Sequence, residues 1–230
     1  MKWIANFLLS SLGKKLIMSL TGLFLCLFLV VHMLGNLQLF VDTDGEAFNL
    51  YAYQMTHNPL IKIIAYGNYF FILLHAVQGI LITTQNRSAK GIAYQGKETA
   101  DTQAKLAAKN MRNLGLLILV FIGLHMWQFW AQMKFFTVTE VTYGDQTVKD
   151  LYTLVRFAFS EAWVCVFYLV SLAALALHLL HGFWSAFQTM GLMNKKYSPL
   201  IRGLALAYAI FIPLGFASMP VVFFLMGAPQ

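Results

Sequence analysis

Charged residues are scarce in this chain. Asp, Glu, Lys and Arg make up only 11% of its 230 residues, whereas soluble domains contain roughly 25%. The charges are also segregated, which leaves long runs of apolar residues between them. A helix of about 20 apolar residues is long enough to cross the hydrocarbon layer of a bilayer. The composition therefore excludes an ordinary soluble domain and indicates a membrane protein.

Five apolar runs are long enough to be transmembrane helices. They predict an all-α membrane protein whose single transmembrane domain covers residues 1–230, with spans at about 16–40, 60–85, 113–134, 156–190 and 203–227. The fourth run is long enough to protrude or tilt. The first is too long for a cleavable signal peptide, and no cleavage site follows it. Apolar residues ahead of it form either a short surface helix or the first turns of the first span.

Cysteine is scarce as well. The two cysteines, Cys26 and Cys165, fall within predicted spans and are interpreted as packing residues. There is no C-x-x-C-H motif for covalent haem attachment and no cysteine cluster for iron–sulfur or zinc. Walker A and G-x-G-x-x-G motifs are also absent. Any electrons that this chain handles must come from another subunit or a lipid-soluble carrier.

The net charge of +7 is distributed in a way that argues against a nucleic acid partner. Most basic residues precede the first span or lie in the second–third and fourth–fifth connections, at Lys2, Lys14, Lys15, Arg87, Lys90, Lys97, Lys105, Lys109, Arg112, Lys195, Lys196 and Arg202. Loops that face the cytoplasm are rich in Lys and Arg. The pattern predicts a multi-pass membrane protein with its N-terminus inside and its C-terminus outside; a bacterial cytoplasmic membrane is the expected location, in line with the resemblance described below.

The two loops expected outside show local structure but little chemistry. In loop 41–60, apolar residues recur at helical intervals, and His57 is interpreted as solvated or interfacial. In loop 135–150, β-branched residues alternate around Gly144 and Asp145, which predicts a small hairpin.

Four histidines lie in four different spans, at His32, His75, His125 and His178. Ionisable residues are costly in lipid, usually face the interior of the helix bundle, and mark functional sites. Four imidazoles on four helices predict two pairs that bind two haems. Counted along the helices, His32 and His125 lie about 24 and 18 Å from the inner face, against about 15 and 18 Å for His75 and His178. This ordering favours an outer pair, His32 with His125, and an inner pair, His75 with His178.

Glycines recur at matched offsets from these histidines. Gly22 lies ten residues before His32, and Gly115 lies ten before His125. Gly79 lies four residues after His75, and Gly182 lies four after His178. Each is therefore expected near its histidine's face, where a flat macrocycle could approach the backbone. Small residues also line ordinary helix–helix contacts in membranes, so a packing role stays open.

Several further residues are candidates for the same sites. His181 follows His178 by three residues, but its face differs by roughly 60°, which makes it the weaker ligand. Cations or hydroxyls near the inner helix ends could bind haem propionates, namely Lys15, Ser19, Arg112, Ser185 and Arg202. The cations among them also obey the positive-inside rule.

Four segments resemble the cytochrome b membrane subunit of succinate dehydrogenases and fumarate reductases, of the five-helix, two-haem, menaquinone-linked type. They are S-L-T-G-L-F-L-C-L-F-L-V-V-H at 19–32, L-L-H-A-V-Q-G at 73–79, F-I-G-L-H-M-W at 121–127 and H-L-L-H-G-F-W-S-A-F-Q at 178–188. The resemblance covers all five spans. It implies that His32, His75, His125 and His178 are axial ligands of two haem b groups.

The resemblance also implies partners and a substrate. A flavoprotein subunit and an iron–sulfur subunit would dock on the cytoplasmic face, and electrons would pass between the iron–sulfur subunit and menaquinone. Succinate would be oxidised on the partner, with no succinate site on this chain. Glu161 and Glu46 are candidate groups for proton transfer to the quinone. Some relatives have a glutamate two residues before the fourth ligand, but Ala176 stands here, so such a proton pathway is in question.

Two other functions fit parts of the pattern. A di-haem cytochrome b of another membrane complex, of the hydrogenase or formate dehydrogenase type, would also have four such histidines. A haem-free, proton-coupled transporter would use histidines as a relay, but it would also need acidic groups along the path. Acids are absent from the middle of every predicted span, which argues against the transporter.

Overall fold

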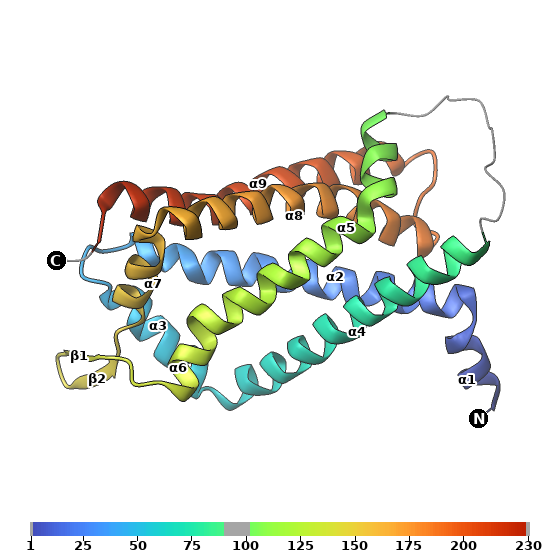
Figure 1. Cartoon of the computed structure of the whole chain (residues 1–230). Helices are drawn as coiled ribbons and strands as arrows, with labels where there is room; N and C mark the ends of the chain where they lie inside the picture. Colours follow the sequence, from blue (N-terminus) through green and yellow to red (C-terminus); the bar gives the residue numbers. More distant parts are fainter. Residues whose placement is uncertain (1, 90–101, 229–230) are drawn as a thin grey trace.

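The computed structural model describes residues 2–89 and 102–228, without the side chains of residues 5, 86–89 and 102–109. Most of the described chain is helical (Figure 1). The α-helices are α1 (Lys2–Leu9), α2 (Ser11–Asn36), α3 (Glu46–His57), α4 (Pro59–Ala89), α5 (Thr102–His125), α6 (Gln132–Phe135), α7 (Leu151–Ser160), α8 (Ala162–Thr189) and α9 (Ser198–Met226). A 3₁₀ turn, η1 (Leu37–Phe40), follows α2, and a π-helix, η2 (Met126–Ala131), follows α5.

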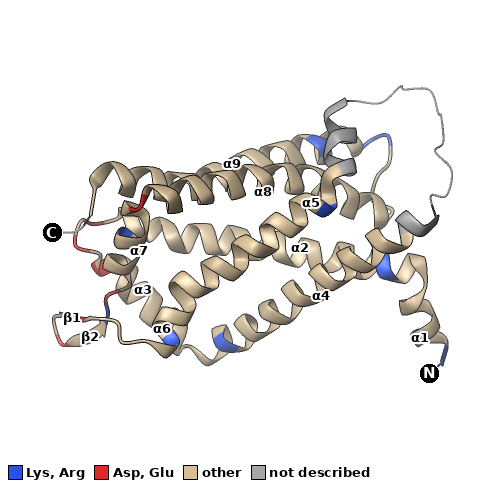
Figure 2. Cartoon of the chain, viewed as in Figure 1, with Lys and Arg blue, Asp and Glu red and all other residues tan. Residues whose placement is uncertain are grey.

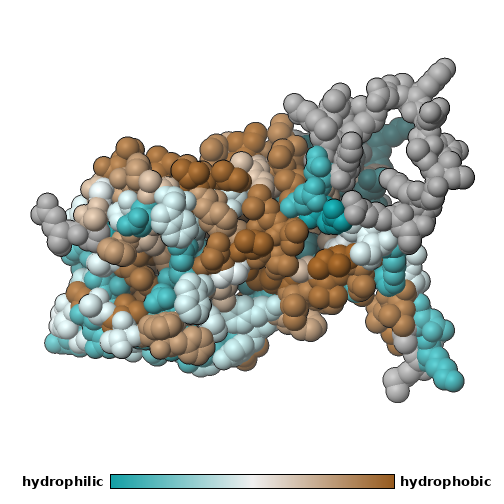
Figure 3. All heavy atoms as spheres, viewed as in Figure 1, coloured by the Kyte–Doolittle hydropathy of each residue, from teal (hydrophilic) through white to brown (hydrophobic). Residues whose placement is uncertain are grey.

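Five stretches of helix are long and apolar enough to cross a membrane, which confirms the predicted number. They cover Ser11–Phe40, Pro59–Gln85, Asn110–Phe135, Ala162–Thr189 and Ser198–Met226. Their outward surfaces carry large exposed apolar side chains, among them Leu27 (65% exposed), Leu73 (65%) and Leu225 (79%). The visible surface is brown along the middle of the molecule (Figure 3). An apolar surface of this extent is characteristic of a protein that lies in lipid.

The predicted start of the fourth span is wrong. Residues 156–160 belong to α7, and the chain turns at Glu161, whose backbone is extended, before α8 begins. The Asp150 side chain starts α7 by accepting a hydrogen bond from the Thr153 amide at 3.0 Å. Three apolar residues of α7, Tyr152, Val155 and Phe159, are buried against protein. Hydropathy merged the two helices because a helix buried in protein can be as apolar as one buried in lipid.

The N-terminal residues form a helix of their own and are not the first turns of the first span. Helix α1 ends at Leu9, and the extended backbone of Ser10 separates it from α2. The Ser10 hydroxyl caps α2 by accepting from the Gly13 amide at 3.1 Å. Trp3 is 73% exposed, so α1 presents an apolar side chain that the rest of the described chain leaves uncovered.

Four of the long helices form a closed ring of neighbours. Helix α2 packs against α4 and α8, and α5 also packs against α4 and α8. Helix α9 packs extensively on α8 and covers that side of the ring (Figure 1). The two diagonals of the ring are therefore α2 with α5 and α4 with α8. Side chains on diagonal helices can meet at the centre.

Charged residues gather at the two ends of the long helices (Figure 2). We call the end with Lys14, Lys15, Arg112, Lys195, Lys196 and Arg202 the basic end, and the end with Asp42, Asp44, Glu46, Asp150 and Glu161 the acidic end. The N-terminus lies at the basic end and the C-terminus at the acidic end (Figure 1). The apolar middle separates the two.

The acidic end holds the predicted hairpin. Strands β1 (Glu140–Tyr143) and β2 (Gln146–Lys149) pair antiparallel, with Glu140 opposite Lys149. Gly144 has a φ of +59° in the turn between them, a conformation that favours glycine. The hairpin prediction is confirmed.

Asn49 ties this end of the molecule together. Its side chain is 1% exposed and accepts hydrogen bonds from the backbone amides of Leu151 and Tyr152, at 2.9 Å each. Its amide group donates to the Tyr143 hydroxyl and the Asp150 carboxylate, at 3.1 Å each. One side chain from α3 thus caps α7 and contacts the hairpin.

Replacing Asn49 with alanine is expected to lower the free energy of unfolding by about 2–4 kcal/mol, because two buried amides lose their acceptor. Asn194→Ala is the matched control. Asn194 also accepts from two backbone amides, at 3.0 Å each, but in an exposed turn where water replaces it. Thermal unfolding in detergent compares the two variants. Equal stability losses would show that Asn49 does not organise the acidic end.

Candidate functional site

The four intramembrane histidines lie in two pairs across the diagonals of the helix ring. His32 on α2 and His125 at the end of α5 have ring centroids 5.8 Å apart. His75 on α4 and His178 on α8 have centroids 6.3 Å apart. These are the pairs that the depth of each histidine favoured. Because each pair joins opposite helices, both pairs lie inside the ring.

The two pairs lie at different levels along the helices. A Cβ added to Gly22 would lie 3.2 Å from Cε1 of His75, and one added to Gly115 would lie 3.8 Å from Cε1 of His178. Gly22 precedes His32 by ten residues, and Gly115 precedes His125 by ten. At 1.5 Å per residue, both helices give a separation of about 15 Å between the pairs.

This placement shows which histidines two of the glycines contact. Gly22 and Gly115 were expected on the same helix faces as His32 and His125, about three turns away, and at that level they lie beside the His75–His178 pair. The reason is that neighbouring helices run in opposite directions. The glycine on the basic-end side of one histidine is therefore level with the histidine of another helix.

Aromatic rings surround the His32–His125 pair. Phe28 stacks on His32 at 5.1 Å, and Phe216 lies 5.6 Å from the same ring. Phe121 stacks on His125 at 5.7 Å, and Phe129 lies 5.3 Å away. Such surroundings exclude water and suit a neutral imidazole or a metal ligand better than a charged one.

Three of the four histidines have a hydrogen-bonding neighbour at Nδ1. Nδ2 of Asn36, which can only donate, lies 3.3 Å from Nδ1 of His32. The hydroxyls of Thr21 and Tyr168, which can also accept, lie 3.1 Å from Nδ1 of His75 and 3.2 Å from Nδ1 of His125. Nδ1 of His178 is buried and has no partner within the described residues. Histidines that bind metal through one ring nitrogen usually donate a hydrogen bond from the other, which the two hydroxyls can accept.

The donor set fits haem better than a bare metal ion. Within the described residues, no group of three or more His, Cys, Asp and Glu side chains could hold a metal, and structural zinc requires four ligands. Haem supplies four nitrogens itself and leaves only axial positions to the protein. Two imidazoles on opposite sides of one metal, with bonds of about 2 Å, have ring centroids roughly 6 Å apart. Both pairs match that spacing.

The other two candidate histidines lie apart from these pairs. His181 is half-buried and makes no ring contact with another histidine in the described part of the chain. His57 is exposed, and its ring stacks on Tyr53 at 4.0 Å. Each is therefore a weaker ligand candidate than the four paired histidines.

The candidate propionate ligands share the basic end, and most of their hydrogen bonds and ring contacts are to residues outside the set. The Ser19 hydroxyl is buried and donates to the Lys15 carbonyl at 2.9 Å. Arg202 lies over the Trp184 ring at 4.4 Å. Arg112 is exposed beside Asn113, and the Ser185 carbonyl accepts from Thr189. No hydrogen bond joins the side chains of any two of these five residues in the described part of the chain.

The two candidate proton-transfer acids lie at the acidic end. Glu46 is the first residue of α3, and Glu161 stands between α7 and α8. Both are exposed. Glu161 makes no capping hydrogen bond with its side chain, but its carbonyl accepts from the Cys165 amide at 3.1 Å. Neither lies within a span.

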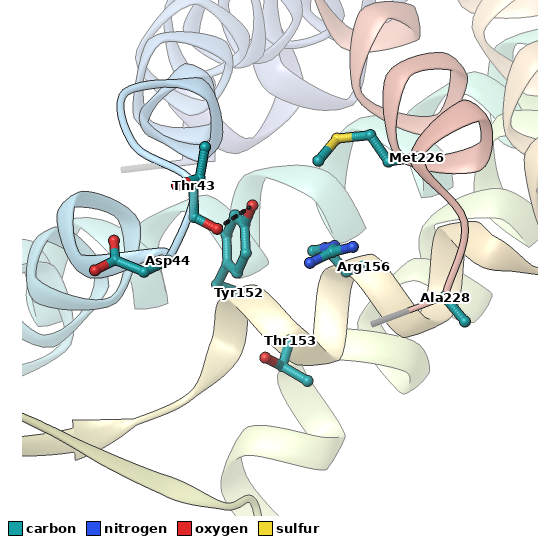
Figure 4. A pocket seen from close by; sticks show the side chains of 7 residues that line it. All are labelled: Thr43, Asp44, Tyr152, Thr153, Arg156, Met226 and Ala228. Carbon is teal, nitrogen blue, oxygen red and sulfur yellow. Dashed lines mark hydrogen bonds between the residues drawn. The ribbon is translucent and has the colours of Figure 1, made fainter. Parts of the chain in front are cut away.

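A cavity of about 480 Å³ opens at the acidic end (Figure 4). Arg156 lies 5.9 Å from the centre of the Tyr152 ring, and the Asp44 carboxylate points away from it. Burial raises the pKa of Tyr152 above its ordinary value, so its phenol stays protonated and donates to the Thr43 carbonyl at 3.4 Å. The four paired histidines do not line this cavity, which is therefore separate from both pairs.

Two polar neighbours of the histidines were missed in the sequence. Tyr168 contacts His125 from another helix, and Thr21 likewise contacts His75 from another helix. Tyr168 lies ten residues before His178 on α8, a distance of about 15 Å along the helix. Tyr168 is level with His125 because the two pairs lie about 15 Å apart along the helices, whereas the depths counted from the sequence were about 18 Å for both His125 and His178.

The chain was also compared with known proteins. It matches no protein-family model, and searches of curated proteins and of solved structures find no similar protein. What the chain binds is therefore inferred from its own residues.

Proposed function

We propose that this chain is the di-haem cytochrome b membrane subunit of a succinate:quinone oxidoreductase. The observation that carries the proposal is the presence of two histidine pairs, with centroids 5.8 and 6.3 Å apart, on the diagonals of one helix ring. His32 with His125 would hold one haem b, and His75 with His178 the other. When bound, each haem would supply a one-electron redox centre.

The protein's own residues give these sites their character. Phe28, Phe121 and Phe129 exclude water from the His32–His125 pair. Gly22 and Gly115 lie beside the rings of His75 and His178, and a side chain at position 22 would crowd the ring of His75. The hydroxyls of Tyr168 and Thr21 orient one histidine in each pair.

The segments around the four histidines support the assignment to this kind of complex, because they resemble its cytochrome b subunit. In this proposal the basic end faces the cytoplasm and binds the iron–sulfur and flavoprotein subunits. Menaquinone exchanges electrons with this chain from the bilayer. The substrate of the dehydrogenase binds to the flavoprotein, so this chain is the anchor and the electron-carrying subunit.

The alternatives differ in what reduces the haems. The test is purification of the tagged chain from its own membranes, followed by an optical spectrum after adding succinate, hydrogen or formate. The proposal predicts copurification of a flavoprotein and an iron–sulfur protein, and reduction of b-type haem by succinate. Reduction by hydrogen or formate alone would assign the chain to another complex. Folded chain without haem would contradict the cytochrome and favour a transporter.

A further inference from the structure

A hydroxyl from another helix contacts one histidine of each pair. The Tyr168 hydroxyl of α8 lies 3.2 Å from Nδ1 of His125 on α5. The Thr21 hydroxyl of α2 lies 3.1 Å from Nδ1 of His75 on α4. Tyr168 is 4% exposed and Thr21 is also 4% exposed. Water therefore does not substitute for either contact.

The direction of the hydrogen bond between each hydroxyl and its histidine follows from the acceptor to which the hydroxyl donates its proton. Tyr168 donates its proton to Oε1 of Gln128 at 2.8 Å. Thr21 donates to the Ile17 carbonyl at 2.8 Å. A hydroxyl has one proton to donate but can accept through its lone pairs. Both oxygens therefore accept from the histidine, which fixes the proton on Nδ1 of His125 and His75.

A proton fixed on Nδ1 leaves the lone pair of Nε2 free. The hydrogen bond made by one ring nitrogen decides whether the other can bind a metal. An acceptor at Nδ1–H also makes the imidazole a stronger electron donor and restricts its rotation. The two contacts thus prepare His125 and His75 to bind through Nε2.

The helix changes its winding at the Tyr168 contact. Immediately after His125, the chain forms the π-helix η2, and Gln128 belongs to it. Short π-helical turns occur frequently at functional sites. Here the turn carries the residue that accepts the Tyr168 proton. The irregular winding and the hydrogen-bond chain therefore occur at the same point.

We propose that Tyr168 and Thr21 are positioning residues that set the electron-donor strength of His125 and His75, and so tune the two haem sites separately. This inference rests on the proposed function, since it requires haem at both pairs. Tyr168 acts with Gln128 as its acceptor. Thr21 acts with the Ile17 carbonyl as its acceptor.

The test is a potentiometric titration of the haems in the purified complex, followed by absorbance. The component lost in His32→Ala identifies the haem at the His32–His125 pair. Tyr168→Phe is expected to raise the midpoint potential of that component alone, because a less basic ligand stabilises the oxidised iron less. Thr21→Val is expected to raise the midpoint potential of the other component alone. Both variants should keep the wild-type haem content.

Two controls separate tuning from a general packing defect. Tyr208→Phe removes another partly buried phenol bond in a span, to the Cys26 carbonyl at 2.6 Å, and should shift neither component. Gln128→Leu should shift the midpoint potential of the same component as Tyr168→Phe. The double variant should show no further shift, since the two residues belong to one chain of hydrogen bonds.

The outcomes are distinguishable. Wild-type protein without two haem components would contradict the proposed function itself. Two components in the wild type, with no shift in Tyr168→Phe or Thr21→Val, would overturn this inference alone. Equal shifts of both components in either variant would also overturn it, because the contacts would then not act on separate sites.

Discussion

Replacing His178 with alanine is expected to remove one of two haems from the protein, whereas replacing His181 should leave both. The ring of His178 faces His75 with centroids 6.3 Å apart, so its loss leaves that site with a single ligand. A low-spin haem with two imidazole ligands cannot form there. The His32–His125 pair lies about 15 Å away along the helices, and the haem that it is proposed to hold should be retained.

His181→Ala is the matched control for this prediction. The two histidines lie three residues apart on α8, and both are half-buried. A general disturbance of the helix would therefore affect both variants alike. Haem per polypeptide and the low-spin absorbance bands are the measurements. Loss of a haem in His181→Ala with full retention in His178→Ala would make His181 the ligand and overturn the pairing.

A leucine at position 22 is expected to reduce haem content from two per chain toward one. The space beside Gly22 is already tight, because an added Cβ would lie 3.2 Å from Cε1 of His75. A leucine would place three further carbon atoms near that ring and displace it. The His32–His125 pair lies ten residues further along α2 and should keep its haem.

Gly123→Leu controls for adding the same side chain to a spanning helix. Gly123 is exposed on α5, and an added Cβ would meet nothing within 4 Å. This variant should retain both haems. Haem extraction and a reduced-minus-oxidised spectrum compare the two. If Gly22→Leu kept both haems, the space beside Gly22 would not be needed by the bound group.

The five spans could be predicted because contact with lipid requires long apolar runs, which a sequence displays directly. The prediction failed where protein takes the place of lipid. Tyr152, Val155 and Phe159 are buried by neighbouring elements at the acidic end. Their hydropathy alone does not distinguish this helix from the fourth span that follows it. Hydropathy reports only how strongly a side chain is excluded from water, and this exclusion is the same whether protein or lipid surrounds the side chain.

The histidine pairs could be anticipated because depth depends only on position along a helix. Contacts between side chains of different helices could not be anticipated from the sequence. Tyr168 and His125 are 43 residues apart, and Thr21 and His75 are 54 apart. Asn49 reaches residues about a hundred positions away. Such contacts depend on helix rotation and crossing, which no local pattern reports.

The count of haem groups per polypeptide in the purified chain tests the central claim most directly. The chain should be extracted with mild detergent, and haem and protein should be quantified in the same sample with a low-spin spectrum. The two histidine pairs predict two haems b per chain. One haem would contradict the two-site arrangement, and well-folded protein without haem would contradict the cytochrome altogether.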